Sequence, residues 1–208
     1  MFDFMERMGS AVCHQMAERS FIFDGMQMPL CARCTGIYTG AFFAFCFFFL
    51  KKRMGNGRPF SISEALLTGL AVLPVGIDGV CSYLGFWESS QLMRIFSGSL
   101  VGAVVPGFLL MAVNMDTKKR DDEQSIYERT AELLLLMVLS VGFSFGLYAG
   151  MPIGGLAAVI SVAGEVLLWG GAVWLLLKSI CKDKAFPYWS VSLLVSAVVL
   201  FLMGGLVP

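Results

Sequence analysis

The chain has 208 residues, of which 57% are hydrophobic and only 14% are charged, and its mean hydropathy is +0.77. Soluble domains usually carry about 25% charged residues, so this composition excludes an ordinary water-soluble protein and predicts an integral membrane protein. The net charge is zero, which gives no basic surface for nucleic acid and makes the lipid bilayer the expected partner.

Residues 1–28 are too few to build a hydrophobic core, and we expect an amphipathic helix or a capping loop resting on the membrane domain. The chemistry of the chain is concentrated here and just beyond. The stretch 13–38 holds three of the six cysteines, the only histidine, and the arginines Arg19 and Arg33. It is the one stretch with enough ligands for metal or thiol chemistry.

Cys13, His14, Cys31 and Cys34 form a possible metal site with the ligand count of structural zinc. Cysteines three residues apart share a helical face or wrap a tight turn, and soft thiolates also suit copper(I) or iron. Cys13 and His14 are adjacent, so their side chains diverge by about 100° in a helix. A three-thiolate site with an open position is therefore an alternative to the four-ligand site.

A thiol–disulfide oxidoreductase is the main rival to the metal site. Arg33 between Cys31 and Cys34 would lower a thiol pKa, which suits a protein that exchanges disulfides across a membrane. Reduced, buried thiols without a special role are the third possibility. Cys46 and Cys81, which lie within apolar spans, are interpreted as small hydrophobic residues, and Cys181 as a free thiol in a loop.

Six stretches are long and apolar enough to cross a bilayer, which predicts an all-α polytopic protein with a single domain over residues 1–208. The predicted spans are 31–50, 62–86, 92–115, 130–149, 153–177 and 188–207. Residues 29–115 carry the polar motifs, 116–129 form a charged cytoplasmic loop, and 130–208 hold the last three spans.

The loop charges predict the orientation in the cell membrane. With six spans, 11 of the 15 basic residues fall on one side, in the loops that begin near residues 51, 118 and 178. The opposite loops, 87–91 and 150–152, contain no basic residue. The positive-inside rule then places both termini and the cysteine motif outside.

Asp78 lies inside the second predicted span, in the sequence PVGIDG at 74–79. An acidic residue at such a position is expensive, and its default interpretation is functional. The neighbouring proline and glycines predict a broken helix, which would fit the substrate site of a solute or ion transporter. The structural alternative is a salt bridge to Arg94, which could itself hold an anionic group.

Other polar residues are candidates for the same pocket. Thr35 and Tyr38 lie one helical turn apart and could face it. Glu88, in a predicted outer turn, is interpreted first as a solvated carboxylate. Glu165 lies in the middle of the fifth span, where it could pair across helices or carry a proton.

The motifs CHQ, ERSF and PLCARCTGIYTG, followed by IDG, resemble an uncharacterised family of small prokaryotic integral membrane proteins. The resemblance covers about residues 11–110 and marks a set of pattern positions. These are Cys13, His14, Arg19, Cys31, Arg33, Cys34, Thr35, Gly36, Tyr38, Asp78, Gly79 and Arg94. The chain has Cys81 where the family pattern is expected to have a glutamine. The resemblance implies no activity.

The sequence thus predicts a Cys/His-rich site at the outer membrane face, above a polar intramembrane pocket that contains Asp78 and Arg94. The ion of this site would be zinc, or else copper or iron. The protein could act on a lipid-linked or small anionic substrate. The alternatives are the thiol–disulfide oxidoreductase that uses Cys31 and Cys34, and the transporter. The sequence names neither the substrate nor the oligomeric state.

Overall fold

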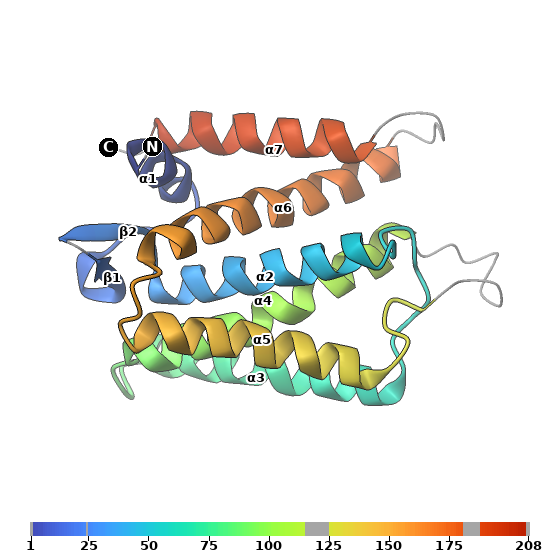
Figure 1. Cartoon of the computed structure of the whole chain (residues 1–208), viewed down its shortest axis with the longest axis horizontal. Coiled ribbons are helices and arrows are strands. Elements are labelled where there is room, and N and C mark those ends of the chain that lie inside the picture. The colour runs from blue at the N-terminus through green and yellow to red at the C-terminus, as the bar shows by residue number, and fades with distance from the viewer. Residues whose placement is uncertain (1, 24, 115–124, 181–187, 207–208) are drawn as a thin grey trace.

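The computed structural model describes residues 2–23, 25–114, 125–180 and 188–206. Its elements in chain order are α1 (Phe2–Ser10), the 3-10 turn η1 (Ala17–Arg19), β1 (Ser20–Phe23), β2 (Met26–Cys31), α2 (Ala32–Leu50), α3 (Ile62–Tyr83), α4 (Gln91–Asn114), α5 (Thr130–Tyr148), α6 (Gly154–Ile180) and α7 (Tyr188–Gly204). The protein is mainly helical, and Figure 1 shows the long helices running side by side.

The predicted spans are confirmed as helices, each to within a few residues. Helices α2 to α6 are long and apolar enough to cross a membrane, and α7 is a shorter apolar helix of 17 residues. That length is at the lower end of what a bilayer needs. Cys181 and most of the charged loop 116–129 lie outside the described residues.

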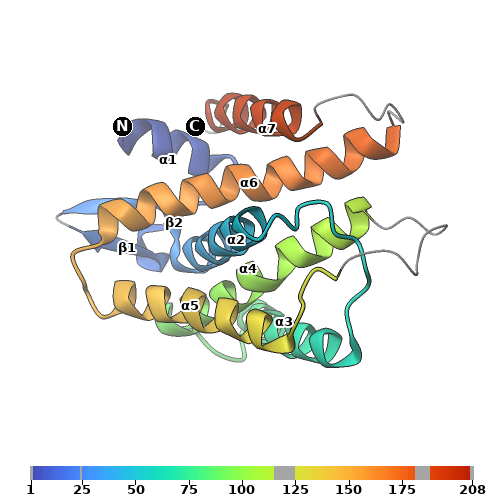
Figure 2. The ribbon, with the colours of Figure 1, turned by 45° about the vertical axis from the view of Figure 1, so that its right-hand side comes forward.

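Helix α2 lies at the centre of the bundle, between α4 and α6 (Figures 1 and 2). Glycines allow this close packing, because a Cβ atom at Gly102 of α4 would overlap the backbone carbonyl of Ile37. A Cβ atom at Gly164 of α6 would likewise overlap the carbonyl of Tyr38. Small residues at membrane helix interfaces permit such approach. The backbone of α2, which follows the cysteine motif, is therefore held on two sides.

The N-terminal segment combines a helix with a β-hairpin. The amphipathic helix that was expected there is α1, whose Met5 and Met8 are buried in the core. The hairpin was not predicted: β1 and β2 pair antiparallel, and Gly25 at their turn has a φ of +76°. Figure 1 shows α1, the hairpin and both termini at one end of the bundle, called here the hairpin end.

Helix α3 corrects the prediction of a broken second helix. It runs without interruption from Ile62 to Tyr83, with Pro74 inside it. Its start is well defined, because Ser61 and Glu64 form a capping box. The prediction was wrong because membrane helices tolerate proline where neighbouring groups adjust to the freed carbonyl. The observation that supported a transporter is therefore absent.

Candidate functional site

The three motif cysteines converge from two segments at the hairpin end. Cys13 lies in the turn after α1, Cys31 ends β2, and Cys34 lies in the first turn of α2. One sulfur from each lies within 4.8 Å of the other two. Tetrahedral zinc with bonds of about 2.3 Å needs sulfurs about 3.8 Å apart. Small side-chain adjustments would therefore bring the three sulfurs around one ion.

Backbone groups hold this arrangement in place. The amide of Cys31 donates a hydrogen bond to the sulfur of Cys13 over 3.3 Å. The pKa of the Cys31 thiol lies well below its usual range, because it accepts hydrogen bonds from the thiols of Cys13 and Cys34 and from backbone amides. Metals bind thiolates rather than thiols, so these hydrogen bonds favour the form of Cys31 that can bind an ion.

His14 lies outside the group of three sulfurs. Its side chain is exposed and lines the same cavity as the cysteines. The chain turns sharply at the next residue, Gln15, which has a φ of 47°. Cys13 is therefore buried while His14 faces outward, as the adjacency of the two residues suggested. The geometry brings together the thiols of Cys13, Cys31 and Cys34 and does not add His14 to them.

Gln15 was missed as a site residue, although it belongs to the CHQ motif. Its side-chain amide donates hydrogen bonds to the carbonyls of Glu6 at 2.7 Å and Pro29 at 2.8 Å. The backbone carbonyl of Gln15 accepts a hydrogen bond from the side-chain amide of Gln27 over 2.6 Å. These bonds tie the turn that carries Cys13 to strand β2, which carries Cys31. A positive φ at a glutamine is a signal that only the structure reveals.

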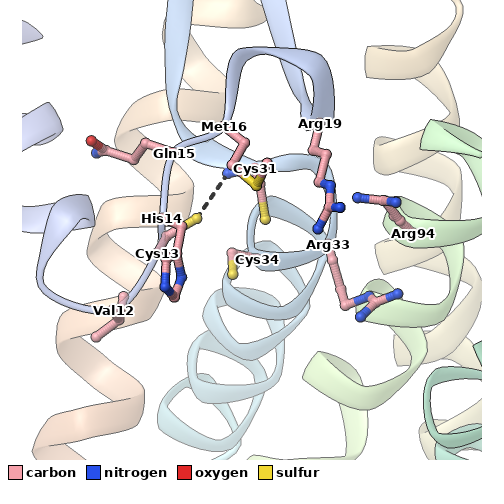
Figure 3. A pocket seen from close by; sticks show the side chains of 10 residues that line it. All are labelled: Val12, Cys13, His14, Gln15, Met16, Arg19, Cys31, Arg33, Cys34 and Arg94. Carbon is pink, nitrogen blue, oxygen red and sulfur yellow. Dashed lines mark hydrogen bonds between the residues drawn. The ribbon is translucent and has the colours of Figure 1, made fainter. Parts of the chain in front are cut away.

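A cavity of about 350 Å³ opens beside the sulfurs (Figure 3). Its lining includes three arginines that come from different elements: Arg19 from η1, Arg33 from α2 and Arg94 from α4. The open side of the cysteine group therefore faces a strongly basic surface.

The predicted partner of Asp78 was wrong. Asp78 forms an ion pair with Arg33 of the cysteine motif, and not with Arg94. It is fully buried and also accepts hydrogen bonds from Ser89 at 2.8 Å and Trp87 at 3.4 Å. Because Asp78 is buried and its carboxylate is bound by the side chains of Arg33, Ser89 and Trp87, it holds Arg33 and the loop before α4 in place. The sequence had not identified Ser89 and Trp87 as hydrogen-bond partners of Asp78.

The other predicted pocket residues are dispersed. Thr35 is buried and donates a hydrogen bond to the carbonyl of Leu30 over 3.2 Å, and Tyr38 packs beside Cys13 and Leu30. Neither lines the cavity with the arginines. Glu88 is exposed, as expected, and lines a neighbouring cavity with Arg19 and Arg94.

Glu165 is fully buried in α6, and neither of its carboxyl oxygens has a hydrogen-bond partner among the described residues. An unpartnered buried polar group costs about 1–3 kcal/mol. We therefore expect Glu165→Leu to stabilise the protein by about that amount in unfolding by SDS titration. Glu64 is the matched control, because it is buried but accepts a hydrogen bond from the amide of Ser61 at 2.9 Å. Glu64→Leu should destabilise; a loss of stability in Glu165→Leu would instead reveal a polar partner.

The family described as "Predicted membrane protein (DUF2085)" matches residues 13–108. The chain is 38% identical over 91 residues to an uncharacterized protein of Methanothermobacter thermautotrophicus, covering 44% of this chain and 78% of the relative. It is 34% identical over 101 residues to an uncharacterized protein of Methanocaldococcus jannaschii, covering 49% of this chain and 63% of the relative.

The match begins at Cys13 and ends within α4, so it contains every cysteine and arginine of the cavity described above. The chain spans just under two thirds of the second relative's length. No solved structure matches the chain. On the strength of these matches, the chain belongs to the DUF2085 family of predicted membrane proteins.

Proposed function

We propose that this membrane protein binds one metal ion through Cys13, Cys31 and Cys34 and presents the ion's open position to the basic cavity. The observation that carries the proposal is the mutual approach of three sulfurs, within 4.8 Å, from two separate segments. Zinc suits three thiolates and a fourth exchangeable ligand, and copper(I) or iron also prefers soft sulfur ligands. A bound zinc ion would polarise an oxygen placed at its open position.

The positive charge of the cavity supports the proposal that the substrate is an anion, either a small molecule or a group linked to a lipid. Arg94 lines the cavity, and in this proposal its guanidinium contacts the substrate. Asp78, which is fully buried, acts as a positioning residue that holds Arg33. This division of roles replaces the earlier expectation that Asp78 and Arg94 would act together.

Metal analysis of protein purified without chelator tests the proposal. We expect about one equivalent of zinc, copper or iron per chain. Treatment with a chelator should remove the ion and make the three thiols accessible to a thiol reagent. Protein that lacks metal when expressed in metal-supplemented medium, with thiols already free to react, would contradict the proposal.

The thiol–disulfide oxidoreductase is the second candidate, because the sulfurs of Cys31 and Cys34 lie within 4.8 Å of each other and a lowered pKa of Cys31 suits a nucleophilic thiol. It predicts metal-free protein with a Cys31–Cys34 disulfide that opens with reductant and closes again with oxidant. Mass spectrometry of alkylated peptides separates it from the metal proposal.

We further propose that the hairpin end faces the outside of the cell membrane. Basic residues described at the opposite end include Lys51, Lys52, Arg53 and Arg58, as the positive-inside rule requires of the cytoplasmic side. An impermeant maleimide should label the exposed position of Glu88→Cys in intact cells. It should label the exposed position of Lys51→Cys only after permeabilisation. The reverse pattern would overturn the orientation.

A further inference from the structure

Three arginine side chains line the cavity beside the cysteines. Arg19, Arg33 and Arg94 come from η1, α2 and α4, and Figure 3 shows the guanidinium groups of Arg19 and Arg94 facing each other. Like charges repel, so bringing three arginines together raises the electrostatic free energy of the fold. A bound anion would lower it. The arrangement therefore has the electrostatics of an anion-binding site.

The charges within the protein leave most of this cluster uncompensated. Among the described residues, Asp78 is the one carboxylate in an ion pair with the cluster, and it binds Arg33. Neither Arg19 nor Arg94 forms an ion pair within the described part of the chain. Glu18 and Glu88 line a neighbouring cavity with these two arginines without pairing to them. Two positive charges are thus available to a ligand.

The protein also fixes the direction of Arg33 and Arg94. The Nε atom of Arg94 donates a hydrogen bond to the carbonyl of Ser89 over 3.2 Å, and its terminal nitrogens make no hydrogen bond within the described ranges. Ser89 is itself anchored, because its hydroxyl donates to Asp78 over 2.8 Å. Asp78 therefore holds Arg33 directly and the support of Arg94 indirectly. A prepared guanidinium loses less conformational freedom when it binds a ligand.

The number and origin of the arginines favour phosphate over carboxylate. A carboxylate offers two oxygens in one plane, which suits a single guanidinium fork. A phosphate group offers oxygens in several directions and can accept hydrogen bonds from donors on different elements. The guanidinium groups of Arg19 and Arg94 face each other from different elements, so one tetrahedral anion can accept hydrogen bonds from both.

We propose that Arg19 and Arg94, assisted by Arg33, bind a phosphate group in this cavity, either free phosphate or the head group of a phospholipid. The cavity of about 350 Å³ is shared with the cysteines, so a phosphate oxygen can approach the open metal position. That last contact rests on the proposed metal site, whereas the binding of phosphate by the arginines stands independently.

Calorimetric titration of the full-length protein in detergent tests this proposal with two probes, inorganic phosphate and dihexanoyl phosphatidic acid. Arg94→Gln and Arg19→Gln should each weaken binding at least tenfold, because each removes a charged fork. Arg94→Lys keeps the positive charge but lacks the paired donors of a guanidinium. Its affinity for the probes should therefore lie between those of the unmodified protein and Arg94→Gln. Arg58→Gln, at an exposed position at the other end of the bundle, is the matched control and should bind as the unmodified protein does.

The two probes separate the sources of phosphate. Arginine-dependent binding of inorganic phosphate supports a soluble ligand, and arginine-dependent binding of phosphatidic acid alone supports a lipid head group. Absence of binding by both probes, or binding unchanged in both glutamine variants, would overturn the proposal. Arg19 is exposed, so Arg19→Gln keeps the test valid if Arg94→Gln does not fold.

Metal content measured on the same samples distinguishes this proposal from the metal function. Protein that binds phosphate through the arginines but holds no metal would refute the metal site alone. Protein that holds metal but binds neither probe would refute the phosphate site alone.

Discussion

Cys31→Ser is expected to reduce the bound metal from about one equivalent per chain to near zero. In the proposed site Cys31 contributes one of the three thiolates. A serine hydroxyl is a poor replacement for a thiolate with zinc or copper(I). Only two sulfur ligands would remain, which is too few for a stable site. Elemental analysis of protein purified without chelator measures the effect.

Cys13→Ser and Cys34→Ser should lose the metal as well, because each removes one of the three grouped sulfurs. Cys46→Ser is the matched control, since Cys46 is a free, half-buried cysteine of α2 outside the sulfur group. It should retain the full metal content. Retention of metal by all three motif variants would rule out the cysteine group as the binding site.

Gly102→Leu is expected to destabilise the protein by more than about 3 kcal/mol. The Cβ atom alone would overlap the carbonyl of Ile37, and a backbone atom cannot swing aside as a flexible side chain can. Leucine would therefore push α4 away from α2. Since Arg33 and Arg94 lie on these two helices, phosphate binding should fall together with stability.

Gly142→Leu is the control for the change at Gly102. Gly142 is an exposed glycine within α5, and nothing lies within 4 Å of the position that a Cβ atom would take. This variant should unfold at the same SDS concentration as the unmodified protein or slightly above it, because leucine is the better helix former. Equal loss of stability in both variants would show that close α2–α4 packing is not the cause.

The sequence was informative about the helices because their apolar runs are long, and about the cysteines because they gather within a short stretch. The sequence did not predict the hairpin, because the local preferences of its residues do not favour strands. Strand β2 contains Pro29, which disfavours a strand assignment, and β1 has only four residues. The hairpin depends on tertiary contacts, such as the hydrogen bonds from the side chain of Gln15 to neighbouring segments.

The partner of Asp78 illustrates a different limit. Nearness in sequence favoured Arg94, which follows one short loop later. The bundle instead brings the last turns of α3 to the start of α2, and Asp78 meets Arg33, 45 residues away. No pattern within one helix reports which neighbouring helix its polar residue will face. The sequence singled out Asp78 as a polar residue inside a span, whereas the identity of its partner required the fold.

The contact between the first and last helices determines when the hairpin end can be completed. Ser10 donates a hydrogen bond to the carbonyl of Gly204 over 3.1 Å, and the guanidinium carbon of Arg7 lies 4.3 Å from the centre of the Phe201 ring. Helix α7 is made after the other described helices, so α1 stays without this partner until α7 has been synthesised. The turn bearing Cys13 follows α1 directly, and it therefore reaches its final place late. Loading of an ion at the cysteines would then be an event that follows membrane insertion and does not guide it.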